Sequence, residues 1–306
     1  MISVVIPLYN KATTVERAVN SVLNQTFQDF ELIVVNNGST DGGEEIVRRM
    51  TDPRVRLVEQ ENQGVSMARN RGIKESKNDW IAFLDADDEW LPTFLETALH
   101  LHDKYPDCAV CASAYRRCNS RGELQDIRLL HCLDSNNFIM DNYFEVAALS
   151  DPPFCSISVM VKKDALEAIG GFPKGVHQGE DLLTWARLAA SYKIAYCTVP
   201  QSIFYTAETS AMDHPKRVPA DDDIVGCELA KIYKKNPMPC LDQYISKWHK
   251  MRASIYLRLP NCSKKCRKEI KEAQKWHRNP RLILYYILSL CPYNLRMFLG
   301  RHLFKK

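Results

Sequence analysis

The feature that most constrains the fold is an alternation of short apolar runs and helical patterns over the first 115 residues. The apolar runs are rich in β-branched residues, and the segments between them repeat apolar residues at helical spacing. The expected strands are Ser3–Pro7, Glu31–Val35, Val55–Val58 and Trp80–Leu84, and the expected helices are Ala12–Gln25, Gly43–Met50, Gly64–Ser76 and Leu91–Tyr105. Strands that are apolar on both faces and separated by helices predict an α/β fold, with a mainly parallel sheet covered on both sides.

Further along the chain the pattern changes. No periodicity dominates between Arg116 and Asp151, after which strands are expected at Cys155–Val161, Ile194–Val199 and Ser202–Tyr205, with helices at Asp164–Ile169 and Glu180–Ser191. Residues 206–223 contain two prolines and no periodicity, which predicts a loop. From Ile224 onward the pattern is helical, with breaks near prolines. We therefore expect an α/β domain over residues 1–220 and a helical region over 221–306.

Charge is distributed unevenly along the chain, whose net charge is +4. Residues 231–306 carry 19 Lys and Arg and 3 acidic residues, a balance of +16, which leaves −12 for residues 1–230. An acidic front suits a cation, and a basic rear suits an anionic surface. Solvated helix faces are the alternative explanation of the same pattern.

The eleven cysteines do not form a disulfide pattern, because they are scattered, odd in number and often set in apolar runs such as Cys108-Ala-Val-Cys111. Met1–Pro7 already has the pattern of a strand rather than that of a secretory signal. We therefore expect free thiols in a reducing cytoplasm. Zinc at Cys108 and Cys111, or at Cys262 and Cys266, is a weaker alternative, since no second clear pair completes four ligands.

Acidic residues follow the fourth expected strand in the sequence Asp85-Ala-Asp87-Asp88-Glu89. Such a run repels itself unless positive charge lies nearby. Carboxylate oxygens suit Mg²⁺ or Mn²⁺, which take one or two carboxylates and complete their shell with phosphate and water. This spacing predicts a divalent cation at Asp87, with Asp88 as a second candidate ligand. An acidic turn that caps the next helix is the alternative.

Polar residues also follow the other strands, and a parallel sheet would bring them to the same edge as the acidic run. Tyr9 and Asn10 follow the first strand and could stack on and hydrogen-bond a nucleobase. Asn36–Gly42 forms a polar turn after the second strand. Arg69 and Arg71 lie in the helix after the third strand and could offset the charge of a diphosphate. Close packing of small residues explains the glycines here but not the convergence of four strand ends.

In this order, the segments resemble family 2 of the nucleotide-sugar-dependent glycosyltransferases, which have the GT-A fold. The resemblance covers roughly residues 1–205 and rests on VVIPLYN at 4–10, QTFQDFELIVVNNGSTDG at 25–42, NQGVSMARNRGI at 62–73, WIAFLDADDEWLP at 80–92, and GGF with GEDLLTWARL at 170–188. It implies a Rossmann-like GT-A sheet, with nucleotide-sugar binding over residues 1–115 and an acceptor and base region over 116–220.

The resemblance also implies roles for single residues. Pro7, Tyr9 and Asn37 would contact the nucleobase, Asp85 the ribose side, and Asp87 the divalent cation. Many relatives have Asp where this chain has Asn37, and that Asp accepts a hydrogen bond from uracil. An amide oxygen can accept the same bond, so a uridine nucleotide stays favoured.

By the same resemblance, the general base lies in the pair Glu180-Asp181. An acceptor hydroxyl is a poor nucleophile until its proton is accepted, so the reaction needs such a group. We expect Asp181 to be the base and keep Glu180 as the second candidate, while capping of the helix is the alternative. One base, with a metal-neutralised leaving diphosphate, implies a single displacement that inverts the anomeric centre.

Near the end of the chain, the apolar run Leu282–Leu290 is flanked by arginines and lysines and followed by Pro292. The run is too short to span a bilayer as a helix, and its pattern favours helices that lie on a membrane surface. Packing of these apolar residues on the protein's own core is the alternative. The sequence shows no nucleic-acid reader motif, so we expect no nucleic-acid partner.

Together these features predict an inverting glycosyltransferase that uses a UDP-sugar with Mn²⁺ or Mg²⁺. It would act on the inner face of a cell membrane, as a peripheral protein, on a glycan or lipid-linked acceptor in surface polysaccharide synthesis. One alternative is a catalytically silent nucleotide-sugar-binding module. Another is a nucleotidyltransferase, which would carry a Gly-rich loop where this chain has Pro7-Leu-Tyr-Asn10. A dehydrogenase is disfavoured because no GxGxxG motif follows any of the expected strands.

Overall fold

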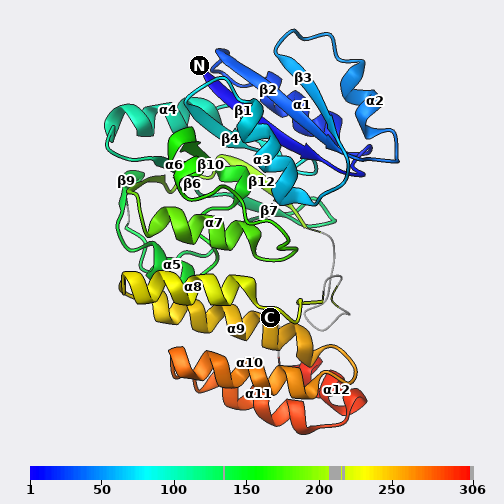
Figure 1. Ribbon diagram of the computed structural model, residues 1–306, viewed down its shortest axis with the longest axis vertical. Coiled ribbons are helices and arrows are strands. Elements are labelled where there is room, and N and C mark those ends of the chain that lie inside the picture. Colours follow the sequence, from blue (N-terminus) through cyan, green and yellow to red (C-terminus); the bar gives the residue numbers. More distant parts are fainter. Residues whose placement is uncertain (134, 207–214, 216–217, 304–306) are drawn as a thin grey trace. The chain divides into compact units, whose positions relative to one another are not determined.

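The structure, a computed structural model, describes residues 1–133, 135–206, 215 and 218–303. The chain consists of two compact units, Met1–Thr206 and Ala207–Lys306 (Figure 1). From the sequence we expect the boundary near Asp221, and much of the loop predicted over 206–223 lies outside the described residues. The first unit ends with the strand β12, Ser202–Tyr205.

An eight-stranded sheet forms the middle of the first unit, in the order β3-β2-β1-β4-β10-β6-β11-β9 (Figure 1). Its strands are β1 Ile2–Leu8, β2 Phe30–Asn37, β3 Val55–Gln60, β4 Trp80–Phe83, β6 Val110–Ser113, β9 Asn137–Met140, β10 Val159–Lys162 and β11 Ile194–Cys197. The pairs β3–β2, β2–β1 and β1–β4 are parallel. The predicted early strands and the mainly parallel sheet are therefore confirmed, and the carboxyl ends of these four strands lie at one edge.

Helices cover both faces of the parallel strands, because side chains along a strand alternate between the two faces. The even-numbered residues of β1 join a core with α1 (Val15–Leu23) and α4 (Phe94–Lys104). Val5 of β1 points to the other face, towards α3 (Val65–Glu75). A Cβ on Gly72 of α3 would lie 2.2 Å from Val5 Cγ1, so only glycine lets this helix approach so closely.

The rest of the first unit departs from the parallel arrangement. Strand β10 is antiparallel to both β4 and β6, β11 is parallel to β6, and β9 is antiparallel to β11. The predicted strand Cys155–Val161 begins instead as a 3-10 helix, η1 (Ser156–Ser158), before β10. A four-stranded sheet has the order β5-β12-β7-β8, with β5 Glu89–Trp90, β7 Arg116–Cys118 and β8 Leu124–Asp126. The remaining helices are α2 Gly43–Arg48, α5 Tyr143–Leu149, α6 Lys163–Ala168 and α7 Glu180–Ala189.

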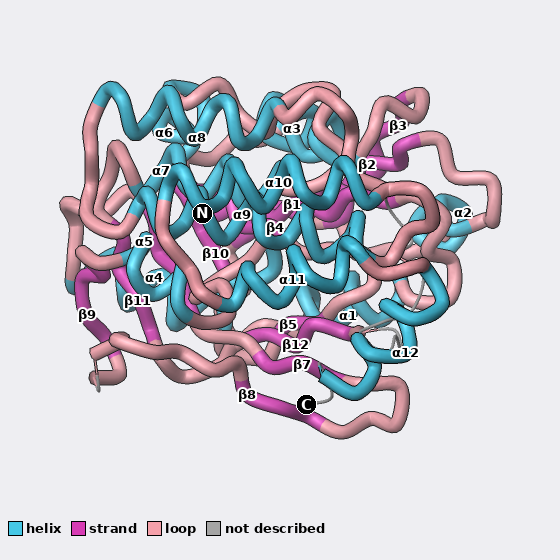
Figure 2. Tube along the Cα trace, turned by 90° about the horizontal axis from the view of Figure 1, so that it is seen from below, coloured by secondary structure: helices cyan, strands magenta, loops and turns pink. Residues whose placement is uncertain are grey.

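The second unit is helical over its described residues (Figure 1). Its helices are α8 Ile224–Lys235, α9 Leu241–Leu257, α10 Ser263–Trp276, α11 Arg281–Leu290 and α12 Tyr293–Leu303. Figure 2 shows α9, α10 and α11 running alongside one another, and their buried residues form one core that includes Tyr256, Ile270 and Leu282. Within the described residues, no helix has the length and apolarity that a membrane crossing requires. All eleven cysteines are free thiols.

Candidate active site

Two loops at the carboxyl ends of β1 and β2 are tied together by hydrogen bonds. Asn10 Oδ1 accepts a hydrogen bond from the Thr40 N–H at 2.8 Å, and Asp41 Oδ2 accepts one from the Ala12 N–H at 2.8 Å. Asn10 has a φ of 50°, which its short polar side chain tolerates. The amide of Asn10 therefore joins the loops, and its contact with a nucleobase stays a prediction.

Pro7 and Tyr9 differ in accessibility. Pro7 is buried within β1, paired with Val35 of β2, whereas Tyr9 is 46% exposed just beyond the strand. An exposed ring at the strand end has the position that stacking on a nucleobase requires. The proposed base contacts of both residues stay predictions.

The amide of Asn37 at the end of β2 is buried and already has partners. Its Oδ1 accepts hydrogen bonds from Gln60 Nε2 at 2.7 Å and from the Gln63 N–H at 3.1 Å. Its Nδ2 donates to Asn62 Oδ1 at 3.1 Å. Asn37 thus fixes the segment after β3, and any bond to a nucleobase would have to be shared with these partners.

Asp87 lies after β4 and faces two cationic side chains that the sequence analysis gave no role. Its carboxylate forms an ion pair with Lys11, which follows Tyr9 and Asn10 in the first loop. Its backbone carbonyl accepts a hydrogen bond from Arg17 at 2.5 Å, and the Arg17 guanidinium lies 3.7 Å from the centre of the Tyr205 ring. Lys11 could have been predicted from the sequence, because it is a basic residue just after a strand parallel to the one that precedes Asp87.

Asp88 is buried, unlike the neighbouring Asp87. Its Oδ1 accepts a hydrogen bond from the Tyr205 N–H at 2.8 Å, which connects the acidic run to β12. Burial, together with the nearby Asp85 carboxylate, raises the pKa of Asp88 to about 9. Asp88 as a metal ligand stays a prediction, and its observed contact is with the backbone of the second sheet.

Arg69 of α3 connects the acidic run to the start of α7. Its Nη2 lies 2.7 Å from Asp85 Oδ1, and its Nη1 lies 3.7 Å from Glu180 Oε1. The guanidinium is buried and lies 5.1 Å from the centre of the Phe172 ring. The structure therefore brings the two predicted acidic groups together around one buried cation. Contact of Arg69 with a diphosphate stays a prediction.

The two carboxylates that open α7 differ in accessibility. Glu180 is buried against Arg69, whereas Asp181 is partly exposed, and its Oδ1 accepts a hydrogen bond from the Leu182 N–H at 2.8 Å. Desolvation raises the pKa of Asp181 above its ordinary value, although Arg69 opposes this change. The role of either carboxylate as the proton acceptor stays a prediction.

The turn before α7 is fixed to α3 by a residue that the sequence analysis did not single out. Asn70 Nδ2 donates to the Phe172 carbonyl and Asn70 Oδ1 accepts from the Phe172 N–H, each at 2.8 Å. Gly171 has a φ of 67°, and a Cβ there would lie 2.5 Å from Asn70 Oδ1. These two hydrogen bonds hold Phe172 beside Arg69.

The carboxylate ligands available at the sheet edge suit a divalent cation. The Asp87 side chain is 38% exposed, and the ammonium of Lys11 shows that positive charge is stabilised there. Mg²⁺ and its analogues need one or two carboxylates and take further oxygens from phosphate and water. Asp87 would supply the carboxylate, and the ion itself stays a prediction.

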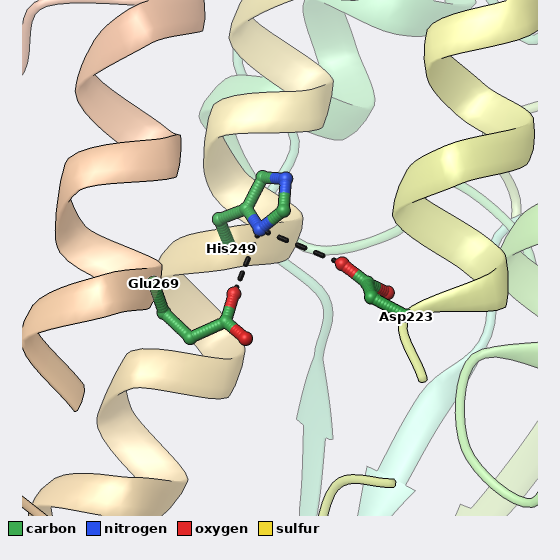
Figure 3. Close-up of side chains that lie close together, drawn as sticks. All are labelled: Asp223, His249 and Glu269. Atoms are coloured by element: carbon green, nitrogen blue, oxygen red, sulfur yellow. Dashed lines mark hydrogen bonds and ion pairs between the residues drawn. The ribbon is translucent and has the colours of Figure 1, made fainter. Parts of the chain in front are cut away.

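A second group of possible metal ligands lies in the C-terminal unit. Ligand atoms of Asp223, His249 and Glu269 lie within 4.8 Å of one another (Figure 3). Arg252 donates to Glu269 Oε1 at 2.9 Å and lies 3.7 Å from Asp223 Oδ1, so a guanidinium already offsets both carboxylates. We interpret this group, the α8–α10 ion network, as a structural connection between α8, α9 and α10.

Sequence comparison relates the first unit to known proteins. The family model described as "Glycosyl transferase family 2" matches residues 3–170. The chain is 44% identical over 100 residues to the uncharacterized glycosyltransferase YibD of Escherichia coli K12, a match that covers 32% of this chain and 29% of YibD. It is 28% identical over 193 residues to an uncharacterized glycosyltransferase of Rickettsia bellii, covering 62% of this chain and 26% of that protein. The chain thus matches less than a third of the length of these two relatives.

Solved structures support the fold of the whole chain. The chain is similar to residues 1–349 of TarS from S. aureus in complex with UDP-GlcNAc, with a TM-score of 0.62 and 16% sequence identity. The similarity covers 98% of this chain and 91% of that chain. The GT-A type of fold, with a helical region after the α/β unit, is therefore confirmed.

Proposed function

The chain belongs to glycosyl transferase family 2, and we propose that it transfers a sugar from a nucleoside-diphosphate donor to an acceptor hydroxyl. The observation that carries this proposal is the bridge through Arg69. It places the Asp85–Asp88 run, suited to a donor diphosphate and its cation, beside the Glu180-Asp181 pair, suited to accepting a proton. A transferase needs both functions within one site.

In the proposed reaction, Asp181 accepts the proton of the acceptor hydroxyl as the new C–O bond forms. Glu180 pairs with Arg69, which holds the start of α7 in place. Mn²⁺ or Mg²⁺ held by Asp87 would offset the charge of the leaving diphosphate. A single displacement assisted by one base inverts the configuration at the anomeric carbon.

We favour a UDP-sugar as the donor. TarS, to which the chain is similar, has been solved with UDP-GlcNAc and with UDP. Tyr9 offers an exposed ring for stacking on the base, and Asn37 offers an amide at the neighbouring strand end. A thermal-shift screen of UDP, GDP, CDP and dTDP sugars with Mn²⁺ tests this choice, and stabilisation by another nucleotide alone would overturn it.

For the acceptor, we propose a lipid-linked glycan presented at the inner face of a cell membrane. The support is the strongly basic composition of residues 231–306, which suits an anionic surface or a lipid diphosphate. A product of this kind would belong to the synthesis of a surface polysaccharide.

The central test of the proposed function is Asp181→Asn. This substitution keeps the size of the side chain and removes its basicity, so transfer should fall by about 100-fold or more while donor affinity changes little. Release of nucleoside diphosphate and calorimetric binding of the donor measure the two effects separately. Asp107→Asn is the matched control, because the Asp107 side chain is 84% exposed.

Two results would contradict this reading. Equal turnover of the Asp181→Asn and Asp107→Asn variants would remove Asp181 as the base. Donor binding by the native chain, without transfer to any acceptor, would favour the silent binding module. In a separate arm, EDTA should weaken donor binding if Asp87 holds a cation.

A further inference from the structure

Helix α10 carries a basic stripe on the side opposite to its buried residues. Cys266, Ile270 and Ala273 pack into the core of the C-terminal unit. The basic stripe has spacings of three, one, three and four residues and consists of Lys264, Arg267, Lys268, Lys271 and Lys275. Lys275 pairs with Glu272 at 2.7 Å, whereas Lys264, Lys268 and Lys271 have no ion pair with a carboxylate within the described part of the chain. The stripe thus keeps most of its positive charge.

Helix α11 is apolar on two sides. Leu282 and Leu288 are buried in the core that it shares with α9 and α10. The opposite side is an apolar stripe at spacings of three, one and three residues, formed by Ile283 (55% exposed), Tyr286 (40%), Ile287 (53%) and Leu290 (61%). Leu295 of α12 is also 48% exposed. A helix whose apolar stripe faces solvent needs a partner to cover it.

The two stripes adjoin. A groove of about 320 Å³ is lined by all five cations of the basic stripe, by Glu272 and by Tyr286, which belongs to the apolar stripe. Arg267 Nη1 also donates to the Ser289 carbonyl of α11 at 3.2 Å, which holds the two helices in register. The cationic side chains therefore meet the exposed apolar stripe at Tyr286.

We propose that this face of α10 and α11 docks on the surface of an anionic lipid bilayer. The lysines would contact lipid phosphates, and the groove is large enough to receive a headgroup. Ile283, Ile287 and Leu290 would enter the boundary between headgroups and acyl chains, as in helices that lie in the membrane interface. The use of this docking face, access to a lipid-linked acceptor, depends on the proposed function.

Other occupants fit this face less well. A second copy of the chain would bring two basic stripes together, and like charges repel. A nucleic acid would use the lysines, but single strands are bound by stacking on aromatic rings, whereas three of the four residues of the apolar stripe are aliphatic. The combination of phosphate-binding cations and aliphatic side chains favours lipid.

The test is flotation of the full-length chain with vesicles of phosphatidylcholine alone or with about 30% phosphatidylglycerol. We expect binding to the anionic vesicles only, weakened by added salt. The triple variant Lys264→Gln, Lys268→Gln, Lys271→Gln and the double variant Ile287→Gln, Leu290→Gln should each bind roughly tenfold less. Matched controls are Lys74→Gln, Lys104→Gln, Lys193→Gln and Leu149→Gln, Val199→Gln, at solvent-exposed positions of the first unit.

The outcomes separate this inference from the proposed function, because binding is read without any transfer reaction. Equal loss in the control variants, or binding to neutral vesicles alone, would overturn the docking face. So would a dimer that the Ile287→Gln, Leu290→Gln variant dissociates in light scattering, or RNA binding in the absence of vesicle binding. Vesicle binding without glycosyl transfer would instead support the docking face and contradict the proposed glycosyltransferase activity.

Discussion

Among single residues, Arg69 contacts both acidic groups of the candidate site. It is buried, and its partners Asp85, Glu180 and Asp181 come from two segments that are distant in sequence. Removing one partner from a buried group of charges costs stability because the remaining charges lose their compensation. The role of Arg69 can therefore be tested by comparing its replacement with that of a surface arginine.

Arg69→Met should lower the free energy of unfolding by about 3 kcal/mol, at the lower end for buried ion pairs because Asp85 is partly exposed. Arg69 also lowers the pKa of Asp181, so its loss should raise that pKa further. Asp181 is then deprotonated only at higher pH, so the acidic limb of the profile of turnover against pH should shift to higher pH.

The matched control is Arg71→Met. Arg71 is 43% exposed and pairs with Glu75 along the same helix, so its loss should cost about 0.5 kcal/mol or less. Urea unfolding measures stability, and turnover against pH measures the base. An unchanged profile in Arg69→Met would mean that this arginine does not act on Asp181.

At the scale of elements, the contact between α3 and the turn before α7 determines where the base lies. Asn70 and Phe172 exchange two hydrogen bonds, and Gly171 makes the approach possible. The sequence predicted the helix Asp164–Ile169 just before Gly170 and Gly171 but gave no indication that α3 was the partner. Only the fold brings these segments together.

Gly171→Ala should destabilise the protein by roughly 2–4 kcal/mol, because it adds a clash with Asn70 to the cost of a positive φ. Gly175→Ala is the control, since Gly175 has a φ of 71° and open space at its Cβ position. That variant should lose only about 1–2 kcal/mol. Chemical denaturation compares the two, and equal losses would show that the contact with Asn70 has no energetic weight.

At the scale of the whole molecule, the two units are stabilised differently. The first depends on a two-sided sheet, and the second on packed helices that share the α8–α10 ion network. Asp223 caps α8 by accepting a hydrogen bond from the Gly226 N–H at 3.0 Å, and also accepts one from Trp248 Nε1 at 2.9 Å. The network thus determines how firmly three helices are joined.

Glu269→Gln should destabilise the second unit by about 3 kcal/mol, because it leaves the buried Arg252 with Asp223, 3.7 Å away, as its remaining carboxylate partner. Hydrogen exchange of α9 and α10 in the full chain measures the effect. Glu272→Gln on the same helix, which removes a pair with the exposed Lys275, should cost about 1 kcal/mol or less. Similar exchange rates in the two variants would contradict a structural role for the network.

The same network predicts a pH dependence. Burial tends to raise the pKa of Glu269, but hydrogen bonds from His249 and Arg252 outweigh it and lower the pKa. A lowered pKa means that Glu269 stabilises the unit above the ordinary value of about 4.3 and loses this contribution as pH falls through its folded pKa. In Glu269→Gln this acid-dependent part of the loss should be absent.

The sequence by itself determined the early strands and helices of the first unit and the family. Strands β1 to β4 and their helices follow from periodicity, because each hydrophobic pattern matches the repeat of a strand or a helix over several residues. Short strands such as β7 and β8, with three residues each, carry too few repeats to be recognised. The candidate site residues likewise follow from motifs at strand ends.

The tertiary structure alone decided which of those residues meet. It turned Asp88 inward to the backbone of Tyr205, gave Asn37 three partners around β3, and placed Lys11 on Asp87. It also joined Asp85 to Glu180 through Arg69, across nearly a hundred residues of sequence. A local pattern records how a segment folds, whereas the pairing of distant side chains depends on how sheets and helices pack.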